Sequence, residues 1–272
     1  MYIRSLLFCP ANKHKLYAKA TCSGADVVIF DLEDSVSKTE KQIAREVLSN
    51  WLNVQSKEIL QGIALRINPI DTEEATEDLK MFQMLSNQPK LIVLPKTESE
   101  KQIQNIFKSV HKKDIKIIPL IETVKGIDNI REIMNQSDKI AYVMLGNADL
   151  SANLNCDNNR FALQYANSKV LFACALHNIP VIDSPCFNIG SNSSELETDT
   201  VFGKSIGFSA RVAIHTKHIA TINKVYSYTK NEIEEAQKII NASEKGVGVI
   251  NGHMIDEAMA KKARQIIDNY RK

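Results

Sequence analysis

The stretch DVVIFDLEDSVSKTEKQIAREVLSNW, residues 26–51, contains the unit that decides the fold. It begins with Asp26–Asp31, a short run rich in Val and Ile, which is typical of a strand covered on both faces. It continues into Glu40–Trp51, where apolar side chains recur at helical spacing. A buried strand followed by an amphipathic helix is the repeating unit of parallel-sheet proteins.

This unit recurs from one end of the chain to the other. Amphipathic stretches such as Glu100–Val110, Ile127–Met134 and Phe161–His177 alternate with apolar runs that we expect to be strands. The expected strands are Ile3–Cys9, Asp26–Asp31, Ile63–Ile67, Leu91–Leu94, Ile115–Ile121, Ile140–Leu145, Pro180–Ile182 and Ala210–Ile214. Eight strand–helix repeats in 272 residues predict a closed (β/α)8 barrel, a TIM barrel, which typically takes about 250 residues.

A doubly wound open sheet is the alternative fold. Such a sheet usually carries a glycine-rich turn after its first strand, whereas this turn reads CPANKHK, residues 9–15. The closed barrel is therefore favoured.

The repeats end near Tyr226, so we divide the chain into a barrel, residues 1–226, and a C-terminal helical extension, residues 227–272. The extension contains an expected helix over Asn231–Ala242, a glycine-bearing stretch over Gly246–Asp256 and a last helix to Arg271. Two interpretations are open. The extension is either a lid over one end of its own barrel or an arm that completes the active site of a neighbouring subunit.

Composition and charge exclude several classes of function. A formal charge of +2, with no dense basic stripe, argues against partners such as nucleic acid or an anionic membrane. The longest apolar runs fall short of the roughly 20 residues of a membrane span, and the N-terminus does not resemble a signal peptide. Five scattered cysteines without a CxxC pair argue against a disulfide framework or a zinc site. We expect a cytoplasmic protein.

Polar side chains follow the ends of most predicted strands. They are Asp31, Glu33, Asp34, Arg66, Asn68, Lys96, Glu122, Asp149, Asp183 and His215. Active sites of (β/α)8 barrels lie at the C-terminal ends of the strands. Charged groups beside Val- and Ile-rich runs are costly unless they are paired or share a solvated cavity. The pattern therefore predicts an active site at this end.

Glu122 and Asp149 follow strands five and six, which are neighbours in a barrel. Two carboxylates with open coordination positions suit Mg²⁺, which prefers oxygen ligands and keeps several waters. The alternative is a carboxylate pair neutralised by Lys96 or Arg66. No binding residue for any other cofactor is predicted.

Arg66 offers a planar fork for a substrate carboxylate, and Glu33 and Lys96 are predicted to bind substrate beside it. Arg66 could instead be a structural partner of Glu33 or Asp34, and the two roles can coexist. A Schiff base at Lys96 is disfavoured, since acidic neighbours keep its ammonium charged. His215 is a base, a ligand, or a structural histidine of the barrel rim.

Seven motifs in order carry a resemblance over essentially the whole chain: RSLLFCPANKHKL, SGADVVIFDLEDSV, LRIN, LPKTES, PLIET, AIH and MID. Together they resemble the citrate lyase beta-subunit-like branch of the HpcH/HpaI aldolase family, which includes malyl-CoA and citramalyl-CoA lyases. The resemblance implies a TIM barrel that cleaves or forms a carbon–carbon bond in a 3-hydroxy-acyl thioester, such as malyl-, citramalyl- or citryl-CoA or a citryl group on an acyl-carrier protein. Homotrimers or hexamers are also implied.

Residue by residue, the resemblance implies that Glu122 of PLIET and Asp149 of ADL bind Mg²⁺. It implies that Arg66 of LRIN holds the substrate carboxylate. It further implies that Asp256 of MID is a catalytic acid contributed by the C-terminal arm of an adjacent protomer.

Two departures bear on the substrate. Ala11 replaces a glycine of the family pattern, and Ala148 stands where the citrate-lyase-like branch has a glutamate; GNADL is closer to the HpaI-type aldolases. A metal-dependent aldolase on free 2-keto-3-hydroxy acids and a carrier-dependent beta-like subunit therefore remain alternatives. A non-enzymatic relative is disfavoured, because a binding-only barrel has no need for all four of Glu122, Asp149, Arg66 and Asp256.

Overall fold

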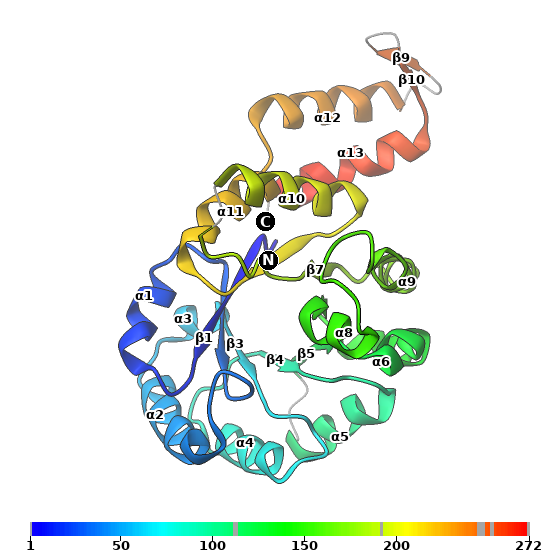
Figure 1. The fold of residues 1–272 in the computed structure, drawn as a ribbon. Helices are drawn as coiled ribbons and strands as arrows, with labels where there is room; N and C mark the ends of the chain where they lie inside the picture. The colour runs from blue at the N-terminus through cyan, green and yellow to red at the C-terminus, as the bar shows by residue number, and fades with distance from the viewer. Residues whose placement is uncertain (1, 111–113, 191–192, 244–247, 251–252, 271–272) are drawn as a thin grey trace.

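Eight parallel strands close into a barrel in chain order, with β8 paired to β1 (Figure 1). The computed structural model describes residues 2–110, 114–190, 193–243, 248–250 and 253–270. The strands are β1 (Ser5–Pro10), β2 (Val27–Asp31), β3 (Ile63–Arg66), β4 (Leu91–Leu94), β5 (Lys116–Ile121), β6 (Val143–Leu145), β7 (Val181–Asp183) and β8 (Ala210–Ala213). Each overlaps one of the eight apolar runs, so the predicted TIM barrel is confirmed.

Helices surround the strands and form the outer layer. They are α1 (Tyr17–Thr21), α2 (Lys41–Asn53), α3 (Lys57–Gln61), α4 (Glu73–Met84), α5 (Glu100–Val110), α6 (Val124–Asp128), α7 (Ile130–Ile133), α8 (Asn147–Leu154), α9 (Gln164–Ala175), α10 (Ser193–Ile206) and α11 (Ile219–Tyr226). The helix expected over Ile127–Met134 is broken at Asn129, whose side-chain amide donates to the Glu98 carbonyl at 2.8 Å. The Asn129 backbone, at φ of −87° and ψ of 8°, lies outside helical geometry.

The apolar core has two layers, because successive side chains of a strand point to opposite faces. On β2, Val27 and Ile29 point into the barrel, whereas Val28 and Phe30 pack against the helices. Ala64 on β3 and Ile118 on β5 also point inward. Both faces of the sheet are therefore apolar, which explains why the strands appear as continuous apolar runs.

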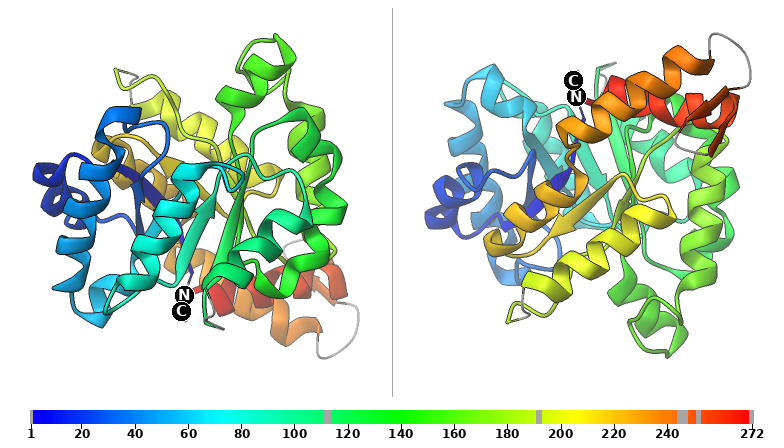
Figure 2. Two further views of the ribbon diagram at one scale, coloured as in Figure 1. Left: turned by 90° about the horizontal axis from the view of Figure 1, so that it is seen from below. Right: turned by 90° about the horizontal axis from the view of Figure 1, so that it is seen from above.

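The extension is a helical arm beyond the barrel. It consists of α12 (Lys230–Ser243), the hairpin β9 (Gly248–Ile250) and β10 (His253–Ile255), and α13 (Glu257–Tyr270). Its two helices pack on each other through a small core that includes Ala236 and Ala263. Figure 2 shows them at the end of the barrel where both chain termini lie.

That end is where the strands begin. Lys261 and Gln265 of α13 face Tyr2, Tyr142 and Pro180, which lie just before β1, β6 and β7. Relative to its own barrel, the arm thus covers the end opposite to the polar strand ends. No helix among the described residues is both long and apolar enough to cross a membrane.

Candidate active site

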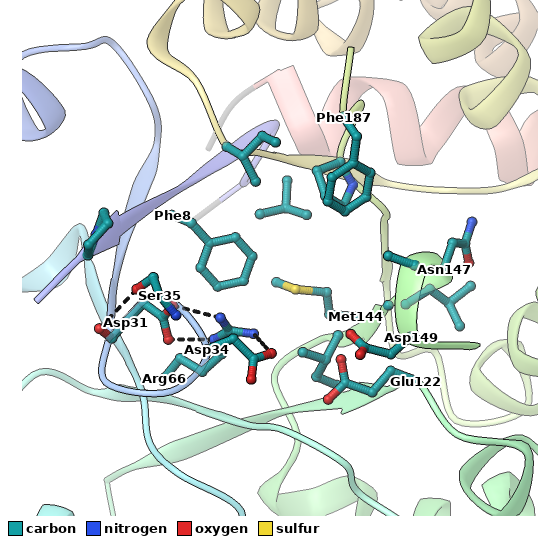
Figure 3. A pocket seen from close by; sticks show the side chains of 18 residues that line it. Phe8, Asp31, Asp34, Ser35, Arg66, Glu122, Met144, Asn147, Asp149 and Phe187 are labelled. Carbon is teal, nitrogen blue, oxygen red and sulfur yellow. Dashed lines mark hydrogen bonds and ion pairs between the residues drawn. The ribbon is translucent and has the colours of Figure 1, made fainter. Parts of the chain in front are cut away.

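A cavity of about 380 Å³ opens at the C-terminal ends of the strands (Figure 3). Its walls differ in chemistry. Asp31, Arg66 and Glu122 lie on one side, and Asp149 stands beside Glu122. Much of the remaining surface is apolar. The cavity lies where the strand-end residues predicted it.

Arg66, at the end of β3, is held by its neighbour on β2. Its Nε and Nη2 atoms donate to the two carboxylate oxygens of Asp31, each at 2.6 Å, and its guanidinium lies 4.6 Å from the centre of the Phe8 ring. Burial would raise the pKa of Asp31, but the Arg66 charge outweighs it and holds that pKa below its usual range. Asp31 therefore fixes the orientation of Arg66.

Glu33 connects Arg66 to Lys96. One Glu33 oxygen lies 2.9 Å from Arg66 Nη1, and the other lies 2.5 Å from Lys96 Nζ. Burial raises the pKa of Glu33 despite these two cations. Lys96 has φ of +48°, which is uncommon for a residue with a side chain. The structure thus brings together the three residues predicted to bind substrate, while Glu33 itself is buried behind Arg66.

Glu122 and Asp149 lie side by side, as their positions on adjacent strands predicted (Figure 3). Among the described residues neither carboxylate forms an ion pair, because Arg66 and Lys96 are bound to Asp31 and Glu33. Glu122 accepts one hydrogen bond, from the Lys96 backbone N–H at 2.9 Å. Burial, followed by the charges of Glu33 and Asp149, raises the pKa of Glu122 to about 8. The two carboxylates therefore have no neutralising cation among the described residues, and the raised pKa means that Glu122 keeps its proton near pH 7.

Gly146, the residue before α8, leaves room for Glu122. A Cβ atom at this position would lie 2.6 Å from the Glu122 Cβ and 2.7 Å from its Oε2. Any side chain here would push Glu122 out of place. The motif GNADL contains this glycine, but the sequence alone does not reveal its role, because the close approach to Glu122 forms between the ends of two strands.

The apolar wall is formed by Phe8, Met144, Val212, Ile214 and Phe187. Three of these come from the inward faces of β1, β6 and β8. Ala148 lines the cavity beside Asp149, at the position where the resemblance led us to expect a glutamate. The cavity thus pairs one charged wall with an apolar space.

Three of the polar strand-end residues form hydrogen bonds that stabilise the fold instead. Asn68 donates to Asp78 at 2.7 Å, and Asp183 is bound by Arg160. The Nδ1 atom of His215 accepts from the Lys217 N–H at 3.1 Å, which caps a short turn. His215 therefore matches the structural alternative. Asp31 is the residue that we named at a strand end without assigning it a role in the site.

Asp256 lies in the arm and outside the cavity of its own chain. It precedes α13, where its Oδ1 accepts from the Met259 N–H at 2.9 Å. The side chain is exposed. Because the arm covers the opposite end of the barrel, the structure does not bring Asp256 to the cavity of its own chain.

Comparison with known proteins identifies the family of this chain. Residues 4–216 match the family model described as HpcH/HpaI aldolase/citrate lyase. The chain belongs to that family. It is a lyase of the citrate lyase beta-like branch, as the motifs predicted.

Relatives in this family match nearly the full length of the chain. It is 29% identical to a (3S)-malyl-CoA thioesterase of Cereibacter sphaeroides, over 97% of this chain and 93% of the relative. It is 28% identical to the citrate lyase subunit beta of Leuconostoc mesenteroides, over 97% and 92%. A crystal structure of CitE from Mycobacterium tuberculosis, in complex with magnesium, acetoacetate and coenzyme A, superposes with a TM-score of 0.82 at 26% identity, covering 98% of each chain.

Proposed function

We propose that this lyase cleaves or forms the carbon–carbon bond of a 3-hydroxy-acyl thioester, and that it depends on Mg²⁺ held by Glu122 and Asp149. One observation carries the proposal: these neighbouring carboxylates have no cationic partner among the described residues and face a cavity at the C-terminal end of the barrel. The magnesium in the CitE complex supports the same choice of metal.

The residues fit this ion. Glu122 and Asp149 would supply two oxygen ligands. The described part of the chain contains no cluster of three or more His, Cys, Asp or Glu side chains that could hold a metal, so any further ligands would be water or substrate oxygens. Mg²⁺ commonly takes one or two protein carboxylates and leaves its other positions to water and substrate oxygens. Burial, followed by the charge of Glu33, raises the pKa of Glu122, and a bound cation would favour its charged form.

When bound, Mg²⁺ supplies a Lewis acid that polarises substrate oxygens and favours loss of the hydroxyl proton. Arg66 provides a fixed positive charge for the substrate carboxylate, and Asp31 holds it in place. Because Asp31 binds Nε and Nη2, and a Glu33 oxygen lies 2.9 Å from Nη1, Arg66 acts as an oriented positive charge at the edge of the cavity.

In the cleavage direction the 3-hydroxyl loses its proton and becomes a carbonyl, while the bond between carbons 2 and 3 breaks. The electron pair passes to the thioester fragment as an enolate, which must take up a proton. We assign that transfer to Asp256 of a second chain, whose arm would reach this cavity. The apolar wall excludes water from the enolate until the proton arrives.

The test compares Glu122→Ala and Asp149→Ala with Asp128→Asn, an exposed carboxylate on α6 paired with Lys169. Release of acetyl-CoA or a related thioester from malyl-CoA and citramalyl-CoA is measured with Mg²⁺ and with excess chelator. We expect at least a 1,000-fold loss for the first two variants, in the range that metal-assisted charge stabilisation supports, and an unchanged control. Full turnover of either alanine variant in chelator would remove the metal assignment.

The role of Asp256 has its own test. Glu122→Gln and Asp256→Asn are each expected to be inactive, because each site needs both residues. Mixed assemblies of the two variants contain some sites with an intact Glu122 and an intact Asp256 from different chains. Activity should therefore return on mixing, and no return would place both residues in one chain or remove Asp256 from the reaction.

A second candidate is a metal-dependent aldolase that acts on free 2-keto-3-hydroxy acids. The observation that favours it is Ala148, which lines the cavity where the thioester branch has a glutamate. Pyruvate release from such acids without any thioester separates this activity from the first. Activity that appears only with a phosphopantetheine-carrying protein would instead identify a carrier-dependent beta-like subunit.

A further inference from the structure

Lys96 has a backbone conformation that residues with a side chain seldom adopt. It is the third residue of the turn 94–97, which follows β4, and its φ is +48°. A positive φ at this place in a β-turn usually falls to glycine or asparagine, because a Cβ atom is crowded there. Thr97 anchors the turn: its Oγ1 donates to the Leu94 carbonyl at 2.7 Å, and its N–H donates to the Leu120 carbonyl at 3.2 Å. A strained residue in an anchored turn indicates that the site requires its conformation.

The backbone of Lys96 holds one of the two carboxylates proposed to bind the metal. Its N–H donates to Glu122 Oε1 at 2.9 Å, which is the single hydrogen bond that this carboxylate accepts within the described part of the chain. The other oxygen, Oε2, lies so close to Gly146 that a Cβ atom there would approach it to 2.7 Å. Glu122 is thus fixed between the turn after β4 and the residue before α8. Hydrogen bonds that orient a metal-binding carboxylate are commonly worth roughly 10–100-fold in metal affinity.

The side chain of Lys96 reaches the other charged group of the site. Its Nζ lies 2.5 Å from Glu33 Oε1 and 3.8 Å from Asp34 Oδ1. Glu33 in turn lies 2.9 Å from Nη1 of Arg66. Arg66 also contacts Asp31 and Asp34, so without the ammonium it would be the one cation, among the described residues, beside three carboxylates. Less of its positive charge would then act on a substrate carboxylate.

Lys96 does not line the cavity, whereas Arg66 and Glu122, the two residues on which it acts, both do. We propose that Lys96 is a positioning residue with two separable effects. Its left-handed backbone holds Glu122 in the orientation that binds Mg²⁺, and its ammonium balances Glu33 so that Arg66 keeps its charge for the substrate. Both effects rest on the proposed function, since they act on its metal site and on its substrate arginine.

The first experiment isolates the backbone effect by measuring Mg²⁺ affinity. Lys96→Gly and Lys96→Val both remove the ammonium, but glycine keeps a positive φ freely, whereas a β-branched residue resists it. The lost charge changes Mg²⁺ affinity equally in both variants, so the difference between them reports the backbone. In titration calorimetry without substrate, we expect Lys96→Val to bind Mg²⁺ about tenfold more weakly than Lys96→Gly. Lys96→Ala should lie between them, and it replaces the valine variant if that variant does not fold.

Asn178 is a matched control for the change in backbone preference. It has φ of +55°, is exposed, and lies just before β7 at the end of the barrel where the strands begin. Asn178→Gly and Asn178→Val should differ in free energy of unfolding but bind Mg²⁺ as wild type does. Equal Mg²⁺ affinities in Lys96→Gly and Lys96→Val would overturn the backbone effect and leave the metal assignment standing. A wild type that binds no Mg²⁺ would overturn both.

The second experiment asks whether the ammonium acts through Glu33 or directly on the substrate. At saturating Mg²⁺, kcat/KM is measured for wild type, Lys96→Gly, Glu33→Gln and the double variant, with malyl-CoA or citramalyl-CoA, whichever wild type cleaves faster. We expect Lys96→Gly to lose about tenfold in the wild-type background, as when a hydrogen bond to a charged group is removed. In the Glu33→Gln background the same substitution should change kcat/KM by less than about threefold, because the charge that the lysine balances is gone.

Two results of this cycle would overturn the ammonium effect. A tenfold loss in both backgrounds would make Lys96 a direct ligand of the substrate, and an unchanged kcat/KM in Lys96→Gly would leave its side chain without a part in the reaction. If wild type cleaves neither thioester, the proposed reaction fails and the ammonium effect fails with it. The calorimetric comparison of Lys96→Gly with Lys96→Val still decides the backbone effect in that case.

Discussion

Two buried arginine–aspartate pairs occupy opposite sides of the barrel wall. Asp31 ends β2 and accepts from Nε and Nη2 of Arg66 through its two carboxylate oxygens; Asp183 ends β7 and accepts from Nη1 and Nη2 of Arg160, at 2.8 and 2.6 Å. The two aspartates are equally buried. We call these the β2 pair and the β7 pair.

The pairs differ in the direction that their strands give them. Asp31 continues the inward series Val27 and Ile29, so the β2 pair faces the cavity. Asp183 follows the inward residue Ile182 and therefore points outward. Because Asp183 is offset by one residue from the inward-facing position, the β7 pair lies among the outer helices, whereas the β2 pair faces the cavity.

The β2 pair and the β7 pair also differ in the charged residues around them. In the β7 pair, Arg160 also binds Asp199 at 2.8 Å, and Asp199 in turn binds Arg211 of β8 at 2.6 Å. Two arginines and two aspartates leave no net charge. The β2 pair adjoins Glu33 and Lys96, and beside it the carboxylates of Glu122 and Asp149 have no ion-pair partner among the described residues. Complete ion pairing accompanies a structural role, and unpaired carboxylates accompany a candidate site for a cation.

Substituting the two arginines by lysine tests this contrast with the largest expected effect. Arg66→Lys loses the fork that Asp31 orients, and we expect kcat/KM to fall about 100-fold, as when one oriented donor is removed. Arg160→Lys should leave kcat/KM within about twofold while lowering the free energy of unfolding by about 1–3 kcal/mol. Kinetics at a temperature where both variants are folded, with denaturant unfolding, checks this.

Equal losses of kcat/KM in the two lysine variants would break the contrast, because the β7 pair would then reach the reaction. Wild-type kcat/KM in Arg66→Lys would show that the β2 pair is structural as well.

Two glycines allow a finer comparison. Gly146 faces Glu122, and a Cβ atom at Gly203 of α10 would lie 2.5 Å from Asp183 Oδ2. Gly146→Ala should displace Glu122 and lower affinity for Mg²⁺ about tenfold; the steric clash should also lower stability by about 1–3 kcal/mol, although its φ of −111° suits alanine. Gly203→Ala should lower stability by about 1–3 kcal/mol and leave metal affinity unchanged. Titration calorimetry with Mg²⁺ and thermal unfolding measure both; metal affinity that falls equally in the two variants contradicts the assignment.

The barrel could be predicted from the sequence, because eight apolar runs alternating with amphipathic stretches leave few other folds. The direction of each strand-end side chain could not. In strands such as VVIFD both faces are apolar, so the pattern does not distinguish the inward set, which ends in Asp31, from the outward set, to which Asp183 belongs. In a sheet with one face exposed to solvent, the alternation of apolar and polar residues would have shown which side chains point inward.

The sequence predicted which residues lie near the candidate site better than it predicted which of them contact one another. Glu122 and Asp149 are neighbours because β5 and β6 are neighbours, and this follows from the fold. That Asp31 rather than Glu33 binds the fork of Arg66 depends on the register between β2 and β3, which places Asp31 opposite Arg66. The position of the arm could not be predicted either, since the packing of α13 depends on residues far apart in the chain.

The smallest predicted effect concerns stability and pH. Glu122 has its pKa raised to about 8, chiefly by burial, so without metal the folded chain binds a proton that the unfolded chain has released above about pH 4.3. Stability conferred by the protonated form is present below that value and is lost as pH rises through about 8. Asp199 has the opposite sign: burial would raise its pKa, but its hydrogen bond from Arg160 and the charge of Arg211 lower it. Its contribution is present above about pH 3.9 and is lost at lower pH.

In chelator at pH 8, we therefore expect Glu122→Gln to raise the Tm by about 2–4 °C and Asp199→Asn to lower it by a similar amount. The gain of Glu122→Gln should shrink as pH falls toward 5, and Mg²⁺ should stabilise wild type but not this variant. A lower Tm for Glu122→Gln at pH 8 would mean that the carboxylate is compensated after all, and the contrast between the two sides of the barrel would fail at its cavity side.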